Sequence, residues 1–304
     1  MKRLGLFPGQ GSQTVGMGSE LKAANPEAAE LFNSADQILG YSLSSLCLEG
    51  PAEKLVLTEN AQPAILLVST ICHRLSGVQL DTAAGHSLGE YSALVAAGVI
   101  RFEDALQLVH KRGRYMQEAV EPGAGKMVAV MGPTEPEIRK VIGECTVGVA
   151  EIANLNSPGQ TVVAGDVAGV DAFAAAMQAA GAKIIPLNVS APFHCRLMRP
   201  AADKLASDLD AISFSSPKFP VISNVTARPI ESGDQARELL KQQVCAPVRW
   251  TESMEFAAEG LGATHSIEFG AGGVLTKLLK RIRPEIARAE VSNPESLEKL
   301  KAAA

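Results

Sequence analysis

Short apolar runs alternate with longer amphipathic stretches over the first 120 residues. Residues 4–7, Leu-Gly-Leu-Phe, form a run short enough for a buried strand, and residues 81–84 form another. Apolar residues at helical spacing predict helices over residues 26–39, 58–76, 90–97 and 102–120. Three of these end at glycines, which are common just beyond helices: Gly40, Gly77 and Gly98. Strands that alternate with helices predict an α/β fold with a parallel sheet.

The pattern changes after the glycine-rich segment 122–125. From there the periodicity predicts strands over residues 126–131, 147–153, 160–164 and 183–188, and helices over 134–143 and 167–180. The order βαββαβ is that of a ferredoxin-like domain. Longer elements return beyond Pro192, with a strand over 265–269 and a helix over 274–282. We therefore expect a small domain, residues 124–189, inserted into a large discontinuous domain of residues 1–123 and 190–304.

Composition removes several classes of protein. The 304 residues are 46% hydrophobic and carry 28 Lys and Arg against 33 Asp and Glu, a net charge of −5. This composition excludes disordered and fibrous chains, and the missing basic surplus argues against a nucleic-acid partner. The longest apolar run, residues 64–72, is too short to cross a bilayer, and the apolar run at residues 4–7 is too short for a signal peptide.

The five cysteines are scattered, without a Cys-x-x-Cys pair, and no histidine stands at metal-ligand spacing. They are typical of reduced thiols rather than of a disulfide framework. We therefore expect a cytoplasmic protein with no bound metal and no membrane partner.

The strongest chemical signal is Gly85-His86-Ser87-Leu88-Gly89, a G-x-S-x-G sequence between a predicted strand and a predicted helix. In that context a nucleophile elbow exposes its serine at the N-terminus of the helix. The tight turn leaves little room for side chains two positions before and after the serine, and it points the Leu88 N–H at an oxyanion. The alternative is a serine that merely caps a helix between two glycines.

A serine nucleophile needs a base, and the chain has five histidines. His194 lies in a proline-punctuated loop at the predicted domain junction, where functional residues concentrate. The other four are less suitable, because His73 and His110 lie inside predicted helices, His86 is expected to point away from the turn, and His265 opens a strand. An ordinary surface histidine is the alternative for His194.

Arg112 stands in the middle of an apolar stripe. On the helix predicted over 102–120 it shares one face with Ala105, Val109 and Met116. A buried guanidinium is costly unless it is paired, and no acidic residue shares this stripe. Its partner is therefore distant in sequence, as in a structural ion pair, or it is a ligand.

The loop at residues 9–13, Gly-Gln-Gly-Ser-Gln, directly follows the first strand. It matches a dinucleotide-binding loop only weakly, because Thr14 stands where the third glycine of G-x-G-x-x-G belongs. Backbone N–H groups of such a loop would equally complete an oxyanion hole with Leu88.

Together these segments resemble the malonyl-CoA:acyl carrier protein transacylases of bacterial fatty acid synthesis, from end to end of the chain. The resemblance rests on residues 9–13, 85–91, 112–113, 154–160 and 193–195, and on Gln243 with Pro247. It implies a hydrolase-like large domain with a ferredoxin-like insert, in agreement with the βαββαβ order. It also implies an acyltransferase without a cofactor, whose substrates are malonyl-CoA and the phosphopantetheinylated acyl carrier protein.

The resemblance also implies roles for individual residues. Ser87 would be the nucleophile, His194 the base, and Gln243 the residue that orients His194 through its backbone carbonyl. The oxyanion hole would consist of the backbone N–H groups of Gln10 and Leu88. Substrate binding would involve Arg112 as the clamp for the malonyl carboxylate, Phe193 as a barrier to a methyl branch, and Asn156.

Other functions fit parts of the sequence. A serine esterase or thioesterase would use the same Ser87 and His194, but Arg112 would be unfavourable in its pocket. A nucleotide-binding oxidoreductase, or a non-catalytic module that binds a carrier, would leave Ser87 and Arg112 unexplained. A trans-acting acyltransferase of polyketide synthesis is a further alternative.

An acidic carrier favours a local basic patch on the enzyme. The candidates for this patch are Arg196 and Arg199, or else Lys183.

Overall fold

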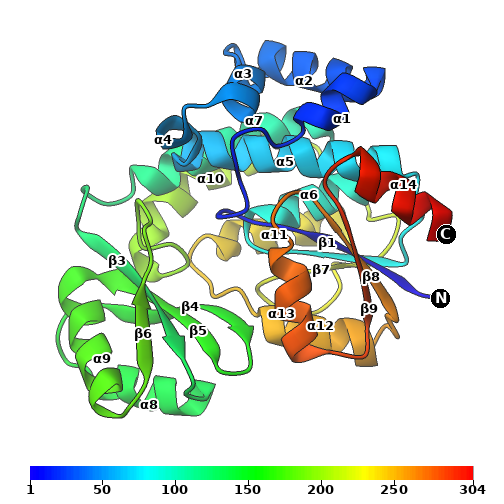
Figure 1. Cartoon of the computed structure of the whole chain (residues 1–304). Coiled ribbons are helices and arrows are strands. Elements are labelled where there is room, and N and C mark those ends of the chain that lie inside the picture. Colours follow the sequence, from blue (N-terminus) through cyan, green and yellow to red (C-terminus); the bar gives the residue numbers. More distant parts are fainter. Residues whose placement is uncertain (304) are drawn as a thin grey trace.

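The computed structural model describes residues 1–303, and it consists of a large α/β part and a smaller antiparallel part (Figure 1). In the large part the strands form one sheet in the order β7-β2-β1-β8-β9, and each neighbouring pair is parallel. The strands are β1 (Arg3–Phe7), β2 (Thr82–Gly85), β7 (Val221–Ile222), β8 (His265–Phe269) and β9 (Ala287–Val291). The predicted parallel sheet is therefore confirmed, with β1 at its centre.

Helices cover both faces of this sheet. Before the small domain the chain forms α1 (Ser19–Ala24), α2 (Pro26–Leu39), α3 (Leu43–Glu49), α4 (Ala52–Leu55), α5 (Thr58–Ser76), α6 (Leu88–Ala96) and α7 (Phe102–Gln117). After it come the 3-10 turn η1 (Arg196–Met198), α10 (Arg199–Asp210), α11 (Gly233–Gln243), α12 (Trp250–Glu259), α13 (Val274–Ile282) and α14 (Pro294–Ala303). Most predicted bounds hold, but the helix expected at 90–97 begins earlier because Ser87 itself is its N-cap.

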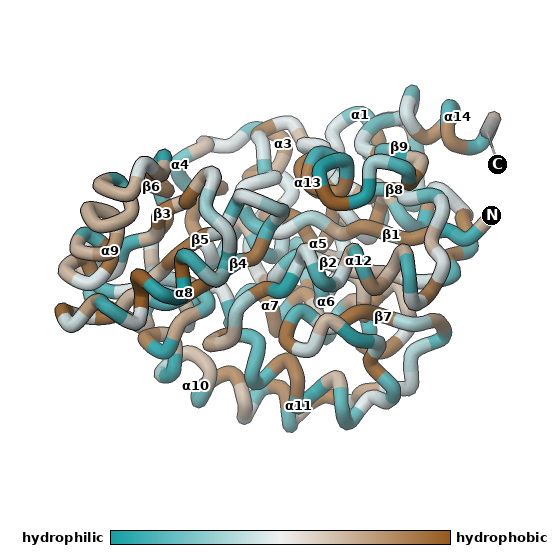
Figure 2. Tube along the Cα trace, turned by 90° about the horizontal axis from the view of Figure 1, so that it is seen from below, coloured by the Kyte–Doolittle hydropathy of each residue, from teal (hydrophilic) through white to brown (hydrophobic). Residues whose placement is uncertain are grey.

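Apolar side chains pack on both faces of the sheet, which explains the uninterrupted apolar run of β1. On one face Leu4 and Leu6 pack with Trp250 of α12 and Leu275 of α13. On the other face Phe7 joins the larger core formed with α5, α6 and α7. In Figure 2 the trace of β1 is mostly brown, whereas the helices show both brown and teal. The end of β1 is thus held between two cores, and the loop that follows it has a fixed starting point.

The smaller part is an antiparallel sheet in the order β4-β5-β3-β6, with two helices packed on one of its faces. Its elements are β3 (Gly125–Met131), α8 (Glu135–Glu144), β4 (Ala150–Ser157), β5 (Gln160–Asp166), α9 (Val167–Ala179) and β6 (Lys183–Pro186). The ferredoxin-like βαββαβ order is confirmed. One strand was misplaced, since the strand predicted at 147–153 begins at Ala150 and continues to Ser157. Two irregularities in its pairing with β5 allow the polar residues after the apolar run to remain part of the strand.

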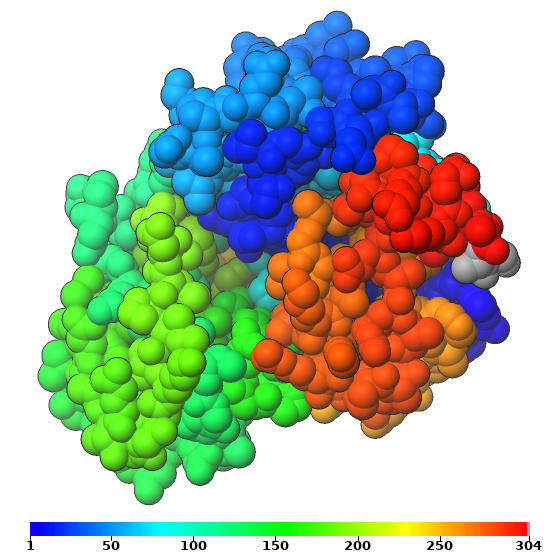
Figure 3. All heavy atoms as spheres, in the orientation of Figure 1, coloured from blue at the N-terminus to red at the C-terminus, as the bar shows by residue number. Residues whose placement is uncertain are grey.

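The small sheet packs against the large domain through its second face. Along β3, Val128 and Val130 face α8 and α9, whereas Met127 and Ala129 join the core of the large domain. Figure 3 shows the small domain as a lobe in green beside the blue and orange parts of the large one. The domain limits at 124 and 189 remain our prediction.

Backbone hydrogen bonds also join the small sheet to the large domain. Val248 of the large domain lies beside β4, with its N–H bonded to the Ala153 carbonyl and its own carbonyl bonded to the Leu155 N–H, each at 2.9 Å. The small sheet is therefore attached at an edge as well as over a face. Among residues 1–303 no helix has both the length and the apolar character needed to cross a membrane.

Candidate active site

The predicted elbow lies where β2 gives way to α6. Ser87 has a φ of 52°, a conformation that L-residues seldom adopt, and it projects at the start of the helix. The positions of Gly85 and Gly89 have no room for a side chain. A Cβ on Gly89 would collide with the Phe7 carbonyl of β1, and a Cβ on Gly85 would collide with the backbone of Gly89. The turn is thus pressed against the central strand, which fixes where the serine points.

His194 lies next to Ser87, as the sequence analysis expected of a base. Its Nε2 is 2.7 Å from the Oγ of Ser87. On the other side of the ring, Nδ1 is 3.0 Å from the carbonyl of Gln243 and 3.1 Å from that of Ala246. Because carbonyls only accept hydrogen bonds, Nδ1 carries the proton and Nε2 is left to accept one from the serine.

The surroundings of His194 keep its ring neutral. The residue is buried, and burial together with the nearby positive charge of Arg112 lowers the pKa of His194 to about 3. A neutral imidazole is the form that can take a proton from a hydroxyl.

Arg112 is buried on α7, on the apolar stripe where the periodicity placed it. Its Nη1 donates to Oε1 of Gln62 at 2.8 Å, and its Nη2 donates to Oε1 of Gln243 at 3.0 Å and to Oγ of Ser87 at 3.1 Å. Within the described chain these partners are uncharged, and no carboxylate forms an ion pair with Arg112. The structural ion pair considered for Arg112 is thus absent from residues 1–303, and its charge faces the serine.

Two backbone donors flank the serine. The N–H groups of Gln10 and Leu88 donate no hydrogen bond to other groups of residues 1–303. Gly9 lies so close to the elbow that a Cβ on it would collide with the carbonyl of His86, so the loop after β1 brings Gln10 beside the turn. Two unpaired N–H groups at such a position can stabilise an oxyanion.

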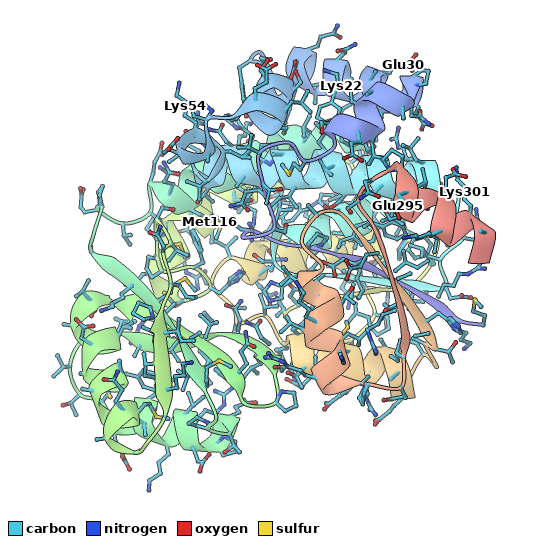
Figure 4. The ribbon with its side chains drawn as sticks, in the orientation of Figure 1. Lys22, Glu30, Lys54, Met116, Glu295 and Lys301 are labelled. Atoms are coloured by element: carbon cyan, nitrogen blue, oxygen red, sulfur yellow. The ribbon has the colours of Figure 1, made fainter. Side chains whose placement is uncertain are left out.

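A cleft of about 180 Å³ opens above the serine, between the two domains. Its polar wall includes Gln10, Ser87, Arg112 and His194, and its apolar wall includes Met116, Met127 and Phe193. Met116, labelled in Figure 4, comes from the last turn of α7. A second cavity, of about 210 Å³, is lined by His265 and Ser266 among other residues. These two are not hydrogen-bonded to each other, because Ser266 donates to the Ala287 carbonyl and Nδ1 of His265 is paired with the Thr264 hydroxyl. The cleft over Ser87 is therefore the candidate site.

Two sequence expectations differ from the structure. Asn156 does not line the cleft, since its Oδ1 is hydrogen-bonded to Nε2 of His86 at 2.8 Å, and Asn154 lines the cleft in its place. His86 does not point away from the site, because it forms part of the cleft wall and packs on Trp250. The pair of His86 and Asn156 links the elbow to β4 of the small domain.

Sequence reasoning missed several polar side chains at the site. Gln62, Glu90 and Asn224 are all buried. Gln62 accepts from Arg112, Asn224 is hydrogen-bonded to the elbow, and Glu90 accepts from Asn224 and Gln243. For Gln62 and Glu90 the available signal was a polar residue at a buried helical position, as it was for Arg112, whereas Asn224 lies in the turn after β7. Among the described residues no group of three or more His, Cys, Asp and Glu is placed to hold a metal ion.

Known proteins resemble this chain over nearly its whole length. The acyl transferase domain family matches residues 6–292. The malonyl CoA-acyl carrier protein transacylase of Escherichia coli (strain K12) is 47% identical over 298 residues, which cover 96% of this chain and 96% of that protein. The protein of the same name from Bacillus subtilis (strain 168) is 46% identical over 300 residues, 96% of this chain and 94% of that protein.

Solved structures agree with this likeness. A malonyl-transacylase in complex with its type II PKS acyl-carrier protein superposes with a TM-score of 0.97 at 43% identity, over 100% of both chains. The malonyl CoA-acyl carrier protein transacylase of Coxiella burnetii gives a TM-score of 0.95 at 40% identity, over 98% of this chain and 96% of that one.

Proposed function

The chain belongs to the acyl transferase family, and we propose that it transfers a malonyl group from coenzyme A to the phosphopantetheine thiol of an acyl carrier protein. The observation that carries the proposal is the placement of Arg112, a buried guanidinium beside Ser87 whose partners in residues 1–303 are neutral. Such a group favours an acyl chain that ends in a carboxylate. The names of the relatives described above support the same substrate and the same acceptor.

The first half-reaction acylates Ser87. As the serine oxygen attacks the thioester carbon, its proton passes to Nε2 of neutral His194. The developing oxyanion accepts hydrogen bonds from the N–H groups of Gln10 and Leu88. When the intermediate collapses, the carbon–sulfur bond breaks and the departing coenzyme A thiolate takes the proton from His194. A malonyl-serine ester remains.

The second half-reaction repeats these steps with the carrier. Its phosphopantetheine thiol gives a proton to His194, and the thiolate attacks the ester carbon. The serine oxygen leaves and recovers the proton, which restores the starting state. Since one site serves two similar thiols in turn, the kinetics are ping-pong.

Throughout the cycle the carbonyls of Gln243 and Ala246 hold the tautomer of His194. No carboxylate is needed for this, because any acceptor that fixes the tautomer and orientation of the imidazole can take the place of the aspartate of a catalytic triad. The imidazolium is therefore less stabilised than beside an aspartate, and the proton is returned readily to the leaving thiolate.

The test is the identity of the covalent intermediate. The wild-type protein is mixed with malonyl-CoA and examined by intact mass and peptide mapping, and we expect one malonyl group on Ser87 that disappears when holo carrier protein is added. Ser87→Ala should carry none. Intersecting double-reciprocal plots, or a malonyl group lost to water as fast as to the carrier, would contradict the proposal; the second result would favour the hydrolase alternative.

The carrier itself can belong to fatty acid or to polyketide synthesis, because one of the structural relatives was solved with a type II PKS carrier. Comparison of kcat/KM for the two kinds of carrier would decide between them. Of the basic residues proposed to meet an acidic carrier, Arg196 is paired with Glu151 at 3.1 Å. Arg199 is exposed and forms no ion pair within residues 1–303, so it is the stronger candidate.

A further inference from the structure

A buried carboxylate lies under the elbow, and the mechanism above gives it no task. Glu90 belongs to the first turn of α6 and is fully buried. Its hydrogen bonds within residues 1–303 come from uncharged amides rather than from a cation. Burial raises the pKa of Glu90 to about 7. A carboxyl group held in such surroundings is costly, so its place in the fold needs an explanation.

One oxygen of Glu90 holds two neighbouring residues. Its Oε2 accepts a hydrogen bond from Nε2 of Gln243 at 2.7 Å and another from the backbone N–H of Asn224 at 3.0 Å. These two residues come from separate segments of the chain, α11 and the stretch after β7. Glu90 is the point at which both meet the elbow helix.

The same two residues hold the backbone of Ser87 from both sides. Asn224 accepts from the Ser87 N–H through Oδ1 at 2.7 Å, and its Nδ2 donates to the carbonyl of Gly85 at 2.7 Å. Gln243 donates from Nε2 to the Ser87 carbonyl at 3.1 Å. Because Ser87 has a positive φ, its two peptide groups need external partners to stay in place. Both partners are anchored on Glu90.

Glu90 also decides which way the amide of Gln243 faces. The Nε2 group points to Glu90 and to the Ser87 carbonyl, which leaves Oε1 for Nη2 of Arg112 at 3.0 Å. If the amide were turned over, its NH₂ group would face the guanidinium and its oxygen would face the carboxylate, so donors would meet donors and acceptors would meet acceptors. The backbone carbonyl of this same Gln243 accepts the hydrogen bond from His194.

We propose that Glu90 is the positioning residue of the site: through the hydrogen bonds that its Oε2 accepts from Gln243 and Asn224, it fixes Ser87, His194 and Arg112 relative to one another. The inference rests on the proposed acyl transfer at Ser87 and deepens it. Glu90 acts by placing one oxygen, Oε2, where it can accept both hydrogen bonds. Its charge is not required, because a protonated carboxyl still accepts at Oε2 when the proton is on Oε1.

The experiment follows the acylation burst. Each protein is mixed with malonyl-CoA in a rapid-quench apparatus, and the release of coenzyme A is fitted with a rate constant and an amplitude per protein chain. The amplitude reports the fraction of folded, competent sites, and the rate constant reports the chemistry within them. A residue that only stabilises the fold changes the amplitude, whereas a positioning residue changes the rate constant.

Two substitutions distinguish the position of the accepting oxygen of Glu90 from the charge of its carboxylate. Glu90→Gln keeps an oxygen that can accept both hydrogen bonds, whereas Glu90→Asp keeps the carboxylate but withdraws it by one methylene. We expect the rate constant of Glu90→Gln to stay within about threefold of wild type, and that of Glu90→Asp to fall about tenfold to a hundredfold, the scale of the loss when reacting groups are slightly misplaced. Acetyl-CoA should show the same loss, because the geometry of Ser87 and His194 is affected as well as that of Arg112.

Glu268 offers a matched control. It is also a fully buried glutamate whose pKa is raised by burial, but it accepts from the N–H groups of Leu275 and Thr276, at the start of α13. Glu268→Asp should therefore lower the amplitude or the melting temperature and leave the burst rate constant unchanged.

The proposal is decided by which of the two Glu90 variants has the lower burst rate constant. A wild-type rate constant in Glu90→Asp, or a greater loss in Glu90→Gln than in Glu90→Asp, would overturn the inference, since charge or packing would then account for Glu90. If the proposed function itself were wrong, the wild-type protein would show no burst with malonyl-CoA. The two failures are thus distinguishable.

Discussion

Arg112 donates a hydrogen bond from Nη2 to the Oγ of Ser87, at 3.1 Å. The group proposed to hold the carboxylate of the substrate and the group proposed to attack its thioester are therefore direct neighbours. Malonyl has a single methylene between these two functions, so both can be engaged at once only in a site where the guanidinium is this close to the serine. A longer diacid would have to fold back to reach both.

Replacement of Arg112 by alanine should therefore change the preference of the enzyme. Charged hydrogen bonds contribute about 1.5–3 kcal/mol, so Arg112→Ala should lower kcat/KM for malonyl-CoA on the order of tenfold to a few hundredfold. Acetyl-CoA lacks the carboxylate and should be used as well as before or better. The measurement is the acylation burst with each thioester, together with the melting temperature.

The control for this experiment is Arg114→Ala. Arg114 lies on the same helix but is exposed, with its guanidinium 5.5 Å from the ring of Tyr115. It should leave both substrates unaffected. Equal losses of malonyl and acetyl transfer in Arg112→Ala, with a lower melting temperature, would mean that the guanidinium is structural.

The rate of acylation should be insensitive to moderate acid. A histidine with an ordinary pKa would be half protonated near pH 6.5, and activity would fall below that value. Because burial and Arg112 lower the pKa of His194 to about 3, the base stays neutral well below pH 6. We expect the burst rate constant to remain level from pH 7.5 to about pH 5, measured by rapid quench in a buffer of constant ionic strength. A decline centred near pH 6.5 would contradict this assignment.

Thermal stability should respond to the same acid range. The folded pKa values of His194 (about 3) and His73 (about 4) lie below the unfolded value of 6.5, and that of His86 is also lowered. As the pH falls below 6.5, the unfolded chain therefore binds protons that the folded chain refuses, and stability drops by about 1.4 kcal/mol per pH unit for each net proton. Glu90 and Glu268 act in the opposite sense, because their folded pKa values are raised above 4.5.

We thus expect the melting temperature to fall between pH 6.5 and pH 4.5, while the burst rate constant stays level. Differential scanning calorimetry across this range is the measurement. His73→Phe removes the only one of these three histidines that lies away from Ser87, and it should make the slope shallower. An increase in stability on acidification would show that the two glutamates dominate.

The glycines of the elbow should not tolerate a methyl group. A Cβ on Gly89 would meet the backbone carbonyl of Phe7 in the central strand, which cannot move without disturbing the sheet. We expect Gly89→Ala to destabilise the protein by roughly 3 kcal/mol or more and to abolish the burst. Gly143→Ala is the counterpart, because nothing lies within 4 Å of its Cβ position on α8. It should stabilise by about 0.5–1 kcal/mol, as alanine does in a helix. Chemical denaturation measures both.

Phe193 should limit the width of the acyl group. It lines the cleft with Met116 and Met127, and it is almost completely buried. One methyl group in an apolar pocket changes selectivity by about tenfold to two hundredfold. We expect Phe193→Ala to raise the ratio of kcat/KM for methylmalonyl-CoA to that for malonyl-CoA by about tenfold. An unchanged ratio would place the barrier to branching elsewhere on the cleft wall.

Local patterns predicted the parts of this protein that depend on neighbours in sequence. The G-x-S-x-G turn between a strand and a helix predicted the elbow, and the apolar stripe around Arg112 predicted its burial. The parallel sheet and the βαββαβ insert also follow from period and order. The second strand of the insert was misplaced because Asn154 and Asn156 break the apolar pattern, although both belong to β4.

Contacts between distant segments were not predictable in the same way. Nothing local indicates that Gln62 accepts from Arg112, that Asn224 holds the Ser87 N–H, or that Ala246 shares His194 with Gln243. These contacts join helices and loops that are far apart in the sequence, and one sequence contains no record of which of them meet. The resemblance to a family implied the role of Gln243, whereas the side chains around it required the structure.

Ser87 and His194 have positive φ values, 52° and 61°, so the backbone at each position favours glycine, whereas catalysis needs the side chain. The left-handed conformation costs an L-residue roughly 1–2 kcal/mol that glycine does not incur. At position 194 this gain is outweighed, because glycine would leave a cavity and two unpaired carbonyls in place of a buried ring. In a library selected for heat resistance alone, glycine should therefore accumulate at position 87, and each such clone would be inert. A lineage released from the need for acyl transfer would be expected to lose its nucleophile before its base.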